Sequence, residues 1–174
     1  MTINKPLTIE LGKFGYLPQQ RERFVSGELW RQWAKDYADI FDEQDVQIAE
    51  KGAGPKMRFH FYEWLAAVLI FHTYGYLSLI EQYEFKLHVR KRAVAKRILP
   101  PEVFALVTDH RQCFGGVQCL DLLSYSPDYS DWFFCEVKGP RDELKKAPLR
   151  FFEELAQVSG KPIRVMRFQT APLY

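Results

Sequence analysis

The chain has 174 residues, and its 24 lysines and arginines nearly balance 22 acidic residues, so the formal net charge is +2. With 47% hydrophobic residues it is too apolar for a disordered protein, and its longest uninterrupted apolar stretch, Trp64 to Phe71, is far shorter than the roughly 20 residues that span a membrane. Because the first residues lack the apolar block of a secretory signal, we expect an intracellular, cytoplasmic protein.

The first 57 residues are predicted to form an arm and one helix. Residues 1–25 contain prolines and glycines without a sustained period, which favours an extended arm packed loosely on the body. Ser26 can cap a helix from about Glu28 to Ala49, where apolar residues recur at helical spacing. A Gly- and Pro-rich linker follows at 52–55, so we expect an N-terminal segment, 1–57, packed on a core, 58–174, in one globular unit.

The next helix should lie at the centre of the molecule. It is predicted from about Phe59 to Tyr74, is apolar on nearly every side, and is ended by Gly75. The segment Ser78-Leu79-Ile80-Glu81 has the form of a capping box, which predicts a third helix that ends before Pro100.

Strands are predicted in the second half of the chain. Two apolar runs, Val117 to Tyr125 and Trp132 to Val137, flank turn residues at 127–130 and predict a β-hairpin. A helix should begin at Pro148, and a last strand should run from Ile163 to Phe168. This order of elements indicates an α/β layer fold whose sheet is covered on both faces.

A run of basic residues without an intervening acid lies in the third helix. Such a run is compatible with a solvated helix face, and equally with a surface that binds the phosphates of a nucleic acid. The sequence leaves both interpretations open for these residues: Lys86, Arg90, Lys91, Arg92, Lys96 and Arg97.

Two acids and a lysine interrupt the apolar hairpin strands. A turn centred between Asp128 and Tyr129 places Asp121 opposite Glu136, with side chains about 4.5–5.5 Å apart, and Lys138 points to the same face as Glu136. Buried carboxylates are costly without a cation, so a hard divalent ion such as Mg²⁺ would suit this cluster. A buried Asp121–Lys138 salt bridge with Glu136 at a solvated edge is the alternative. Asp128, although preceded by proline, lies at the tip of the turn and is too far from Glu136 to share an ion with it.

These residues resemble a known nuclease motif. Leu120-Asp121-Leu122-Leu123, followed by Glu136-Val137-Lys138-Gly139-Pro140 and then Asp142 and Leu144, resembles the VRR-NUC branch of the PD-(D/E)xK nucleases, which includes the Fanconi-anaemia-associated nuclease domain and small phage-type proteins. The resemblance is clear over residues 115–168 and weaker from about residue 59. It implies a restriction-endonuclease-like core, a small mixed sheet flanked by helices, preceded by an N-terminal helical segment.

The resemblance also implies chemistry. It implies a Mg²⁺- or Mn²⁺-dependent DNA endonuclease or exonuclease, with Asp121, Glu136 and the Val137 carbonyl as metal ligands and Lys138 at the attacking water. Members commonly carry another acid on the preceding helix, which Glu63 fits, although Glu63 could instead be an exposed acid of a first helical turn. Glu81 competes for this role but is more simply a capping residue.

Two departures from the family pattern are visible. Leu120 replaces the usual proline, and Ala147-Pro148 falls where members often carry a glutamine, so Lys145 or Lys146 would have to contact phosphate there. The four histidines and three cysteines have no metal-binding spacing.

The implied partner is branched or flapped DNA, recognised by its shape in repair or replication. Small relatives tend to act as homodimers, for which Trp30, Trp33 or the N-terminal arm could supply a surface. The alternative function is a nucleic-acid-binding or assembly module that has kept the fold and lost catalysis.

Overall fold

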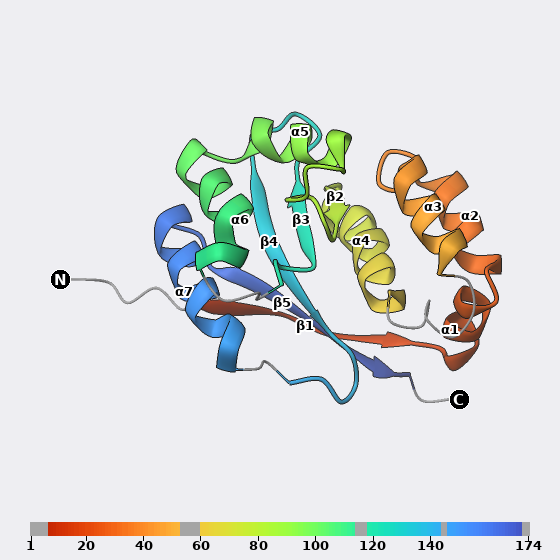
Figure 1. Ribbon diagram of the computed structural model, residues 1–174. Coiled ribbons are helices and arrows are strands. Elements are labelled where there is room, and N and C mark those ends of the chain that lie inside the picture. The colour runs from red at the N-terminus through yellow and green to blue at the C-terminus, as the bar shows by residue number, and fades with distance from the viewer. Residues whose placement is uncertain (1–6, 53–59, 114–117, 144–145, 172–174) are drawn as a thin grey trace.

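A five-stranded mixed sheet with helices on both faces forms the body of the protein (Figure 1). The structure, a computed structural model, describes residues 7–52, 60–113, 118–143 and 146–171. The strand order is β1-β5-β4-β3-β2. The predicted layer fold is confirmed, and among the described residues no helix is long and apolar enough to cross a membrane.

The strands are β1 (Thr8–Tyr16), β2 (Leu77–Ile80), β3 (Leu122–Tyr125), β4 (Trp132–Lys138) and β5 (Ile163–Thr170). The helices are α1 (Pro18–Val25), α2 (Glu28–Asp36), α3 (Glu43–Lys51), α4 (Phe61–Tyr74), α5 (Val89–Ile98), α6 (Pro101–Cys113) and α7 (Lys146–Ser159). Strands β2, β3 and β4 run antiparallel, whereas β5 returns parallel to β4 after the crossover helix α7.

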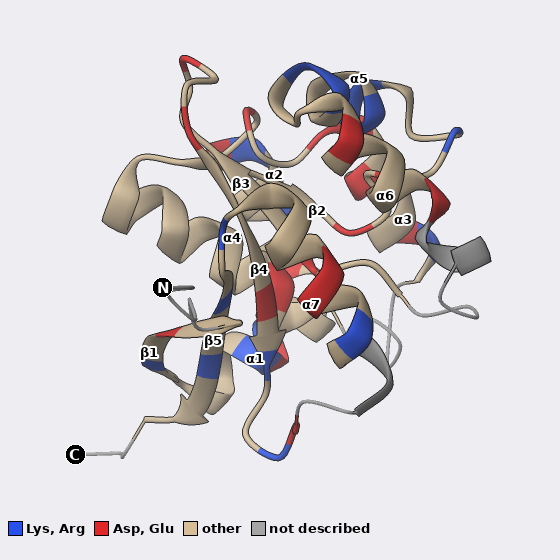
Figure 2. Cartoon of the chain, turned by 90° about the vertical axis from the view of Figure 1, so that its left-hand side faces the viewer, with Lys and Arg blue, Asp and Glu red and all other residues tan. Residues whose placement is uncertain are grey.

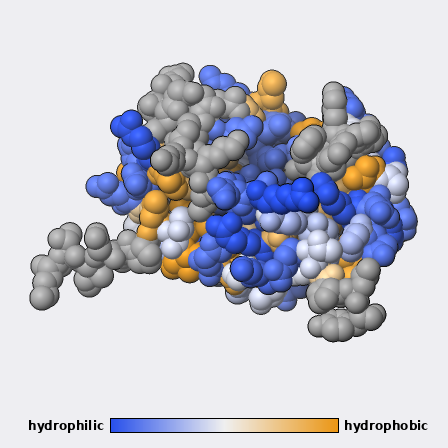
Figure 3. All heavy atoms as spheres, turned by 90° about the horizontal axis from the view of Figure 1, so that it is seen from below, coloured by the Kyte–Doolittle hydropathy of each residue, from blue (hydrophilic) through white to orange (hydrophobic). Residues whose placement is uncertain are grey.

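The prediction of a loosely packed arm is wrong for the described residues 7–25. They form β1, which pairs in parallel with β5, and the helix α1. Glycines interrupt the alternation expected of a strand, and a bulge between Glu10 and Gly12 shifts the register, so the pattern was not recognisable. Seen from below, the side on which β1 lies, most of the described surface is hydrophilic (Figure 3). Strand β1 is an edge of the sheet, and a charged side chain on it, such as the exposed Lys13, disfavours pairing with another chain. The predicted boundary at 57 lies outside the described residues.

The long helix predicted from Glu28 to Ala49 is two helices, α2 and α3. The break occurs because Asp42 caps α3. The Asp42 carboxylate accepts a hydrogen bond from Asp45 N at 2.9 Å, and the Asp45 carboxylate accepts one from Asp42 N at 3.1 Å. The prediction that Trp30 or Trp33 supplies a dimer surface is also wrong. Trp30 and Trp33 are buried in the core beside α4, so neither is available to a partner chain.

Helix α4 lies between the sheet and the helices α1, α2 and α3, as its apolar character predicted (Figure 1). Gly75 ends it in the left-handed conformation, with φ of +69°. A second core on the opposite face packs α5, α6 and α7 against the strands. The sheet is therefore buried on both sides, which is why β3 and β4 are apolar on both faces.

The expected capping box at Ser78 is a strand instead. Ser78 lies within β2, and its hydroxyl is hydrogen-bonded to that of Ser124 on β3 at 2.8 Å, whereas Glu81 directly follows the strand. The following helix, α5, ends at Ile98, before Pro100, as predicted. Helix α6 begins at Pro101 and was not predicted, and α7 starts two residues earlier than expected, at Lys146.

A buried ion pair joins α3 to α5. Lys91, on the buried side of α5, donates to Asp45 and to the Ile80 carbonyl, each at 2.5 Å, and its side chain is 1% exposed. The proposal that Lys91 belongs to a surface for phosphates is therefore wrong. Its ammonium links Asp45 of α3 to the carbonyl of Ile80 at the end of β2.

Replacing Lys91 should destabilise the fold strongly. Lys91→Met leaves the Asp45 carboxylate buried without its cation, which costs about 3–5 kcal/mol. Urea unfolding at pH 7 measures this, with Lys96→Met on the exposed side of α5 as the matched control. A loss below 1 kcal/mol for Lys91→Met would mean that the pair contributes little.

Candidate metal centre

The hairpin register brings Asp121 and Glu136 together. Leu122 pairs with Cys135 and Tyr125 with Trp132, which is the predicted register, and Asp121 directly precedes this ladder. The Asp121 carboxylate accepts a hydrogen bond from Val137 N at 2.7 Å. Asp121 O also accepts one from Glu81 N at 2.8 Å, so both the backbone and the side chain of Asp121 are fixed.

Lys138 pairs with the acid of its own strand. Its ammonium lies 2.5 Å from Glu136 Oε1, and the two side chains are 16% and 10% exposed. The alternative of an Asp121–Lys138 bridge is not what the structure contains, since the lysine binds Glu136 and the aspartate binds a backbone amide.

Glu63 joins these groups from α4. It lies in the first turn of that helix, but its carboxylate points inward: Oε2 is buried and has no hydrogen-bond partner among the described residues. The alternative of an exposed first-turn acid is therefore wrong. A buried carboxylate oxygen without a donor is costly, and an unoccupied lone pair of this kind is suited to a cation.

Glu81 is the acid that sequence reasoning undervalued. Glu63, Glu81 and Asp121 each present an oxygen, and these atoms all lie within 4.8 Å of one another. Glu81 follows β2 with φ of +43° and Gln82 with φ of +51°, a left-handed conformation that non-glycine residues rarely adopt. His60 Nδ1 lies 3.1 Å from Glu81 Oε2 and holds that carboxylate at the cluster.

Burial and mutual repulsion raise the pKa values of the clustered acids. Desolvation, followed by the charges of Glu136 and Glu63, raises the pKa of Asp121 well above its ordinary value. Desolvation, with the Glu81 charge, raises the pKa of Glu63 to about 8. Desolvation likewise raises the pKa of Glu136, although Lys138 opposes the shift.

Lys138 keeps its proton in this setting. Burial lowers its pKa, but the adjacent Glu136 carboxylate outweighs burial and the net direction is upward. One ammonium cannot neutralise the cluster of acids. The residues present supply several oxygen donors, one of them without a partner, and this donor set fits a hard divalent cation.

The turn after β4 completes one wall of the site. The Asp142 carboxylate accepts a hydrogen bond from Gly139 N at 2.9 Å, which closes the Gly-Pro-x-Asp turn. A Cβ at Gly139 would lie 2.8 Å from the Tyr62 ring and 2.9 Å from Asp142 Oδ2, so only glycine fits there. Beside this turn is an open cleft of about 490 Å³ that Glu63 and Val137 also line.

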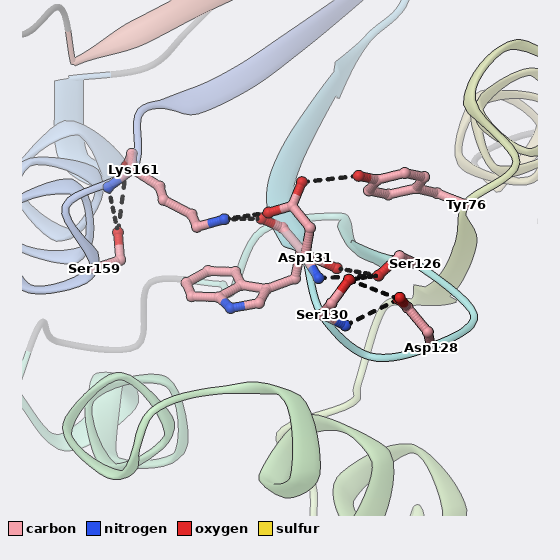
Figure 4. A network of polar contacts seen from close by, with 8 residues as sticks. Tyr76, Ser126, Asp128, Ser130, Asp131, Ser159 and Lys161 are labelled. Atoms are coloured by element: carbon pink, nitrogen blue, oxygen red, sulfur yellow. Dashed lines mark hydrogen bonds and ion pairs between the residues drawn. The ribbon is translucent and has the colours of Figure 1, made fainter.

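Asp128 is remote from the cluster, as predicted. It accepts hydrogen bonds from the Ser130 backbone and hydroxyl at the tip of the β3–β4 turn, where Asp131 binds Lys161 and Tyr76 (Figure 4). The hydroxyl of Ser126, followed by the hydroxyl and backbone amide of Ser130, lowers the pKa of Asp128 to about 2. The Pro-Asp dipeptide therefore stabilises a turn and takes no part in the acidic cluster.

The basic residues of α5 and the preceding Lys86 do not form one surface. Lys86, Lys96 and Arg97 are exposed, whereas Arg90 binds Asp42 at 2.7 Å and Arg92 binds the Glu84 carbonyl at 2.5 Å. Figure 2 shows basic residues on α5, apart from the red band of the one acidic residue on β4. Arg97 lies over the Tyr129 ring at the hairpin tip, seven residues before Glu136, an extended length of roughly 23 Å. Lys145 lies outside the described residues, as does the side chain of Lys146.

Comparison with protein-family models finds no match, and neither does comparison with curated proteins. Among solved structures, the chain is similar to one described as paFAN1 bound to DNA with a two-nucleotide 5′ flap and a gap. The aligned part covers 49% of this chain and 16% of that chain, with 19% sequence identity and a TM-score of 0.41. A likeness this partial does not identify a family.

From the acidic cluster we expect that, without metal, the free energy of unfolding falls as the pH rises. Because the folded pKa of Glu63 lies near 8 and its ordinary value is 4.5, its contribution is fully present below pH 4.5 and is lost as the pH rises toward 8. In EDTA the unfolding midpoint should therefore fall between pH 5 and 8. Glu63→Gln should remove much of this fall, worth on the order of a few kcal/mol, and the exposed Glu153→Gln should not.

Metal binding should reverse that loss. Mg²⁺ or Mn²⁺ that binds only the folded chain stabilises it by mass action, so the midpoint of the wild type at pH 8 should rise with metal concentration. The rise should be smaller in Glu63→Gln. A wild-type midpoint that is insensitive to both ions would mean that the cluster is not a metal site.

Proposed function

We propose that this protein is a metal-dependent nuclease that hydrolyses phosphodiester bonds in DNA. The observation that carries the proposal is the convergence of Asp121, Glu136 and Lys138 on the β3–β4 hairpin, with the buried carboxylate of Glu63 beside them. Asp121, Glu136, Glu63 and the Val137 carbonyl are the proposed ligands of Mg²⁺ or Mn²⁺. Asp121, Glu136, Lys138 and Glu63 are the proposed catalytic residues.

The chemistry needs a nucleophile at neutral pH and compensation for the charge of the phosphorane. A divalent ion supplies both when bound, since it acidifies water and polarises a phosphate oxygen. Lys138 remains an ammonium beside Glu136, so its proposed role is to donate hydrogen bonds that orient the attacking water or the phosphate oxygen. Val137 N holds Asp121 in place, and α4 holds Glu63 from the other side.

The topology supports a restriction-endonuclease-like core. Helix α4, the antiparallel strands β2, β3 and β4, the crossover helix α7 and the parallel strand β5 form a mixed sheet with its acids near one end of the hairpin. We assign these elements, within residues 58–174, to the nuclease core. Strand β1 and helices α1, α2 and α3 extend the sheet and cover α4.

We expect selection of DNA by shape rather than sequence. Exposed Lys86, Lys96 and Arg97 are suited to backbone phosphates, and such contacts carry no base information. Flaps, junctions and nicks are therefore the proposed substrates, in repair or replication.

Cleavage assays test the proposal directly. Branched and linear DNA incubated with Mg²⁺ or Mn²⁺ should be cut, and EDTA should abolish cutting. Lys138→Ala and Glu136→Gln should each lower the rate by about 10²–10⁴, because each removes a group proposed to act on the reacting atoms. Asp128→Asn, at the hairpin tip, is the matched control and should cut like the wild type.

Two outcomes would contradict the proposal. Cutting that survives Lys138→Ala would point to a contaminating nuclease. DNA binding without any cutting, with or without metal, would instead favour the nucleic-acid-binding or assembly module.

A further inference from the structure

A cleft of about 490 Å³ opens beside the acidic cluster, between α1, the start of α4 and the turn after β4. Glu63 and Val137 line this cleft, together with Arg21 and Tyr62. Neither α1 nor β1 was expected to contribute to the site, since residues 1–25 were predicted to be a loose arm. The fold brings this N-terminal segment next to the proposed catalytic groups.

One nitrogen of the Arg21 guanidinium is buried without an acceptor among the described residues. This nitrogen is Nε, and the guanidinium forms no ion pair with another described residue. Its Cζ lies 5.5 Å from the centre of the Tyr62 ring, which positions the side chain over the cleft wall. By contrast Arg23, two residues along the same helix, is exposed and pairs with Glu28 at 2.7 Å. A buried donor left unpaired is costly, so Arg21 is suited to a ligand oxygen.

Other donors face the same cleft. The hydroxyls of Tyr16 and Tyr62 lie 3.0 Å apart, and because their mutual bond uses one hydrogen, the second remains available to an acceptor. Arg141 adds an exposed guanidinium from the turn after β4. Asp142 lines the cleft as well, and its Oδ2 accepts a hydrogen bond from Gly139 N. The cleft therefore combines two guanidinium groups and two tyrosine hydroxyls with the carboxylates of Glu63 and Asp142.

Arg21 also borders a second hollow of about 630 Å³ along α1, which shares Tyr16 and Thr170 with the first. The two hollows adjoin at Arg21, which among the described residues is the one cation that lines the second, beside Glu22 and Val25. A phosphate is therefore expected on the side of the first cleft, where Arg141 also lies.

We propose that Arg21, with Arg141 and the Tyr16–Tyr62 hydroxyl pair, binds a backbone phosphate of the nucleic-acid strand next to the scissile bond. This inference rests on the proposed nuclease function, because it places the phosphate relative to the acidic cluster. The planar fork of a guanidinium suits two oxygens of one phosphate, and the tyrosine hydroxyl supplies a further hydrogen bond.

The test is the salt dependence of binding, measured by fluorescence anisotropy with a labelled single strand in EDTA, so that the strand stays intact. Arg21→Gln should weaken binding at low salt by about tenfold and lower the slope of log K against log salt by about 0.7, the value for one phosphate contact. Arg23→Gln, on the same helix, should leave the slope unchanged. Arg21→Lys should retain most of the slope, since it keeps the charge.

Equal slopes for Arg21→Gln and Arg23→Gln would overturn the proposal. If Arg21→Gln lowers the melting temperature so far that it cannot be titrated, Arg141→Gln on the exposed turn takes its place, with the same reduction in slope expected. The nuclease proposal fails separately, by an absence of wild-type cutting, whereas the slopes are measured without any cleavage.

Discussion

Carboxylates held close together away from water repel one another, and this protein concentrates them where its hairpin meets its central helix. Asp121 and Glu136 come from β3 and β4, while Glu63 and Glu81 approach from α4 and the end of β2. In the part of the chain that the structure describes, the one ammonium that contacts this group is that of Lys138. The strained backbone at Glu81 and the bare oxygen of Glu63 indicate that the fold accepts a local cost that a bound cation could offset.

The surroundings keep these groups in place. Helix α4 is apolar on nearly every side and is packed between the sheet and the N-terminal helices, so Glu63 has little freedom to turn toward solvent. Tyr62, the neighbouring residue, packs against Phe168 of β5 and leaves no room for a side chain at Gly139. Packing on α4 thus shapes both the acidic cluster and the cleft beside it.

Several features followed from local pattern. The hairpin register was predictable because turn chemistry and strand length fix which residues face each other, and the apolar helix ending at Gly75 was predictable from its composition. Strand β1 was missed because glycines and a bulge hide its alternation, and β2 because Ser78 and Glu81 imitate a capping box. Lys91 was predicted to belong to a basic surface, because the sequence does not indicate that α3, far away along the chain, would pack on it and pair Asp45 with it.

The sequence by itself determined the sheet-and-helix architecture and the alignment of Asp121, Glu136 and Lys138, because neighbouring strands are governed by short-range rules. Only the tertiary structure decided that Glu63 points inward, that Glu81 joins the cluster, and that Arg21 lines the adjoining cleft. These residues lie on elements separated by long stretches of chain. Their meeting depends on how α1 and α4 pack on the sheet, which is a property of the whole buried core and not of any local pattern.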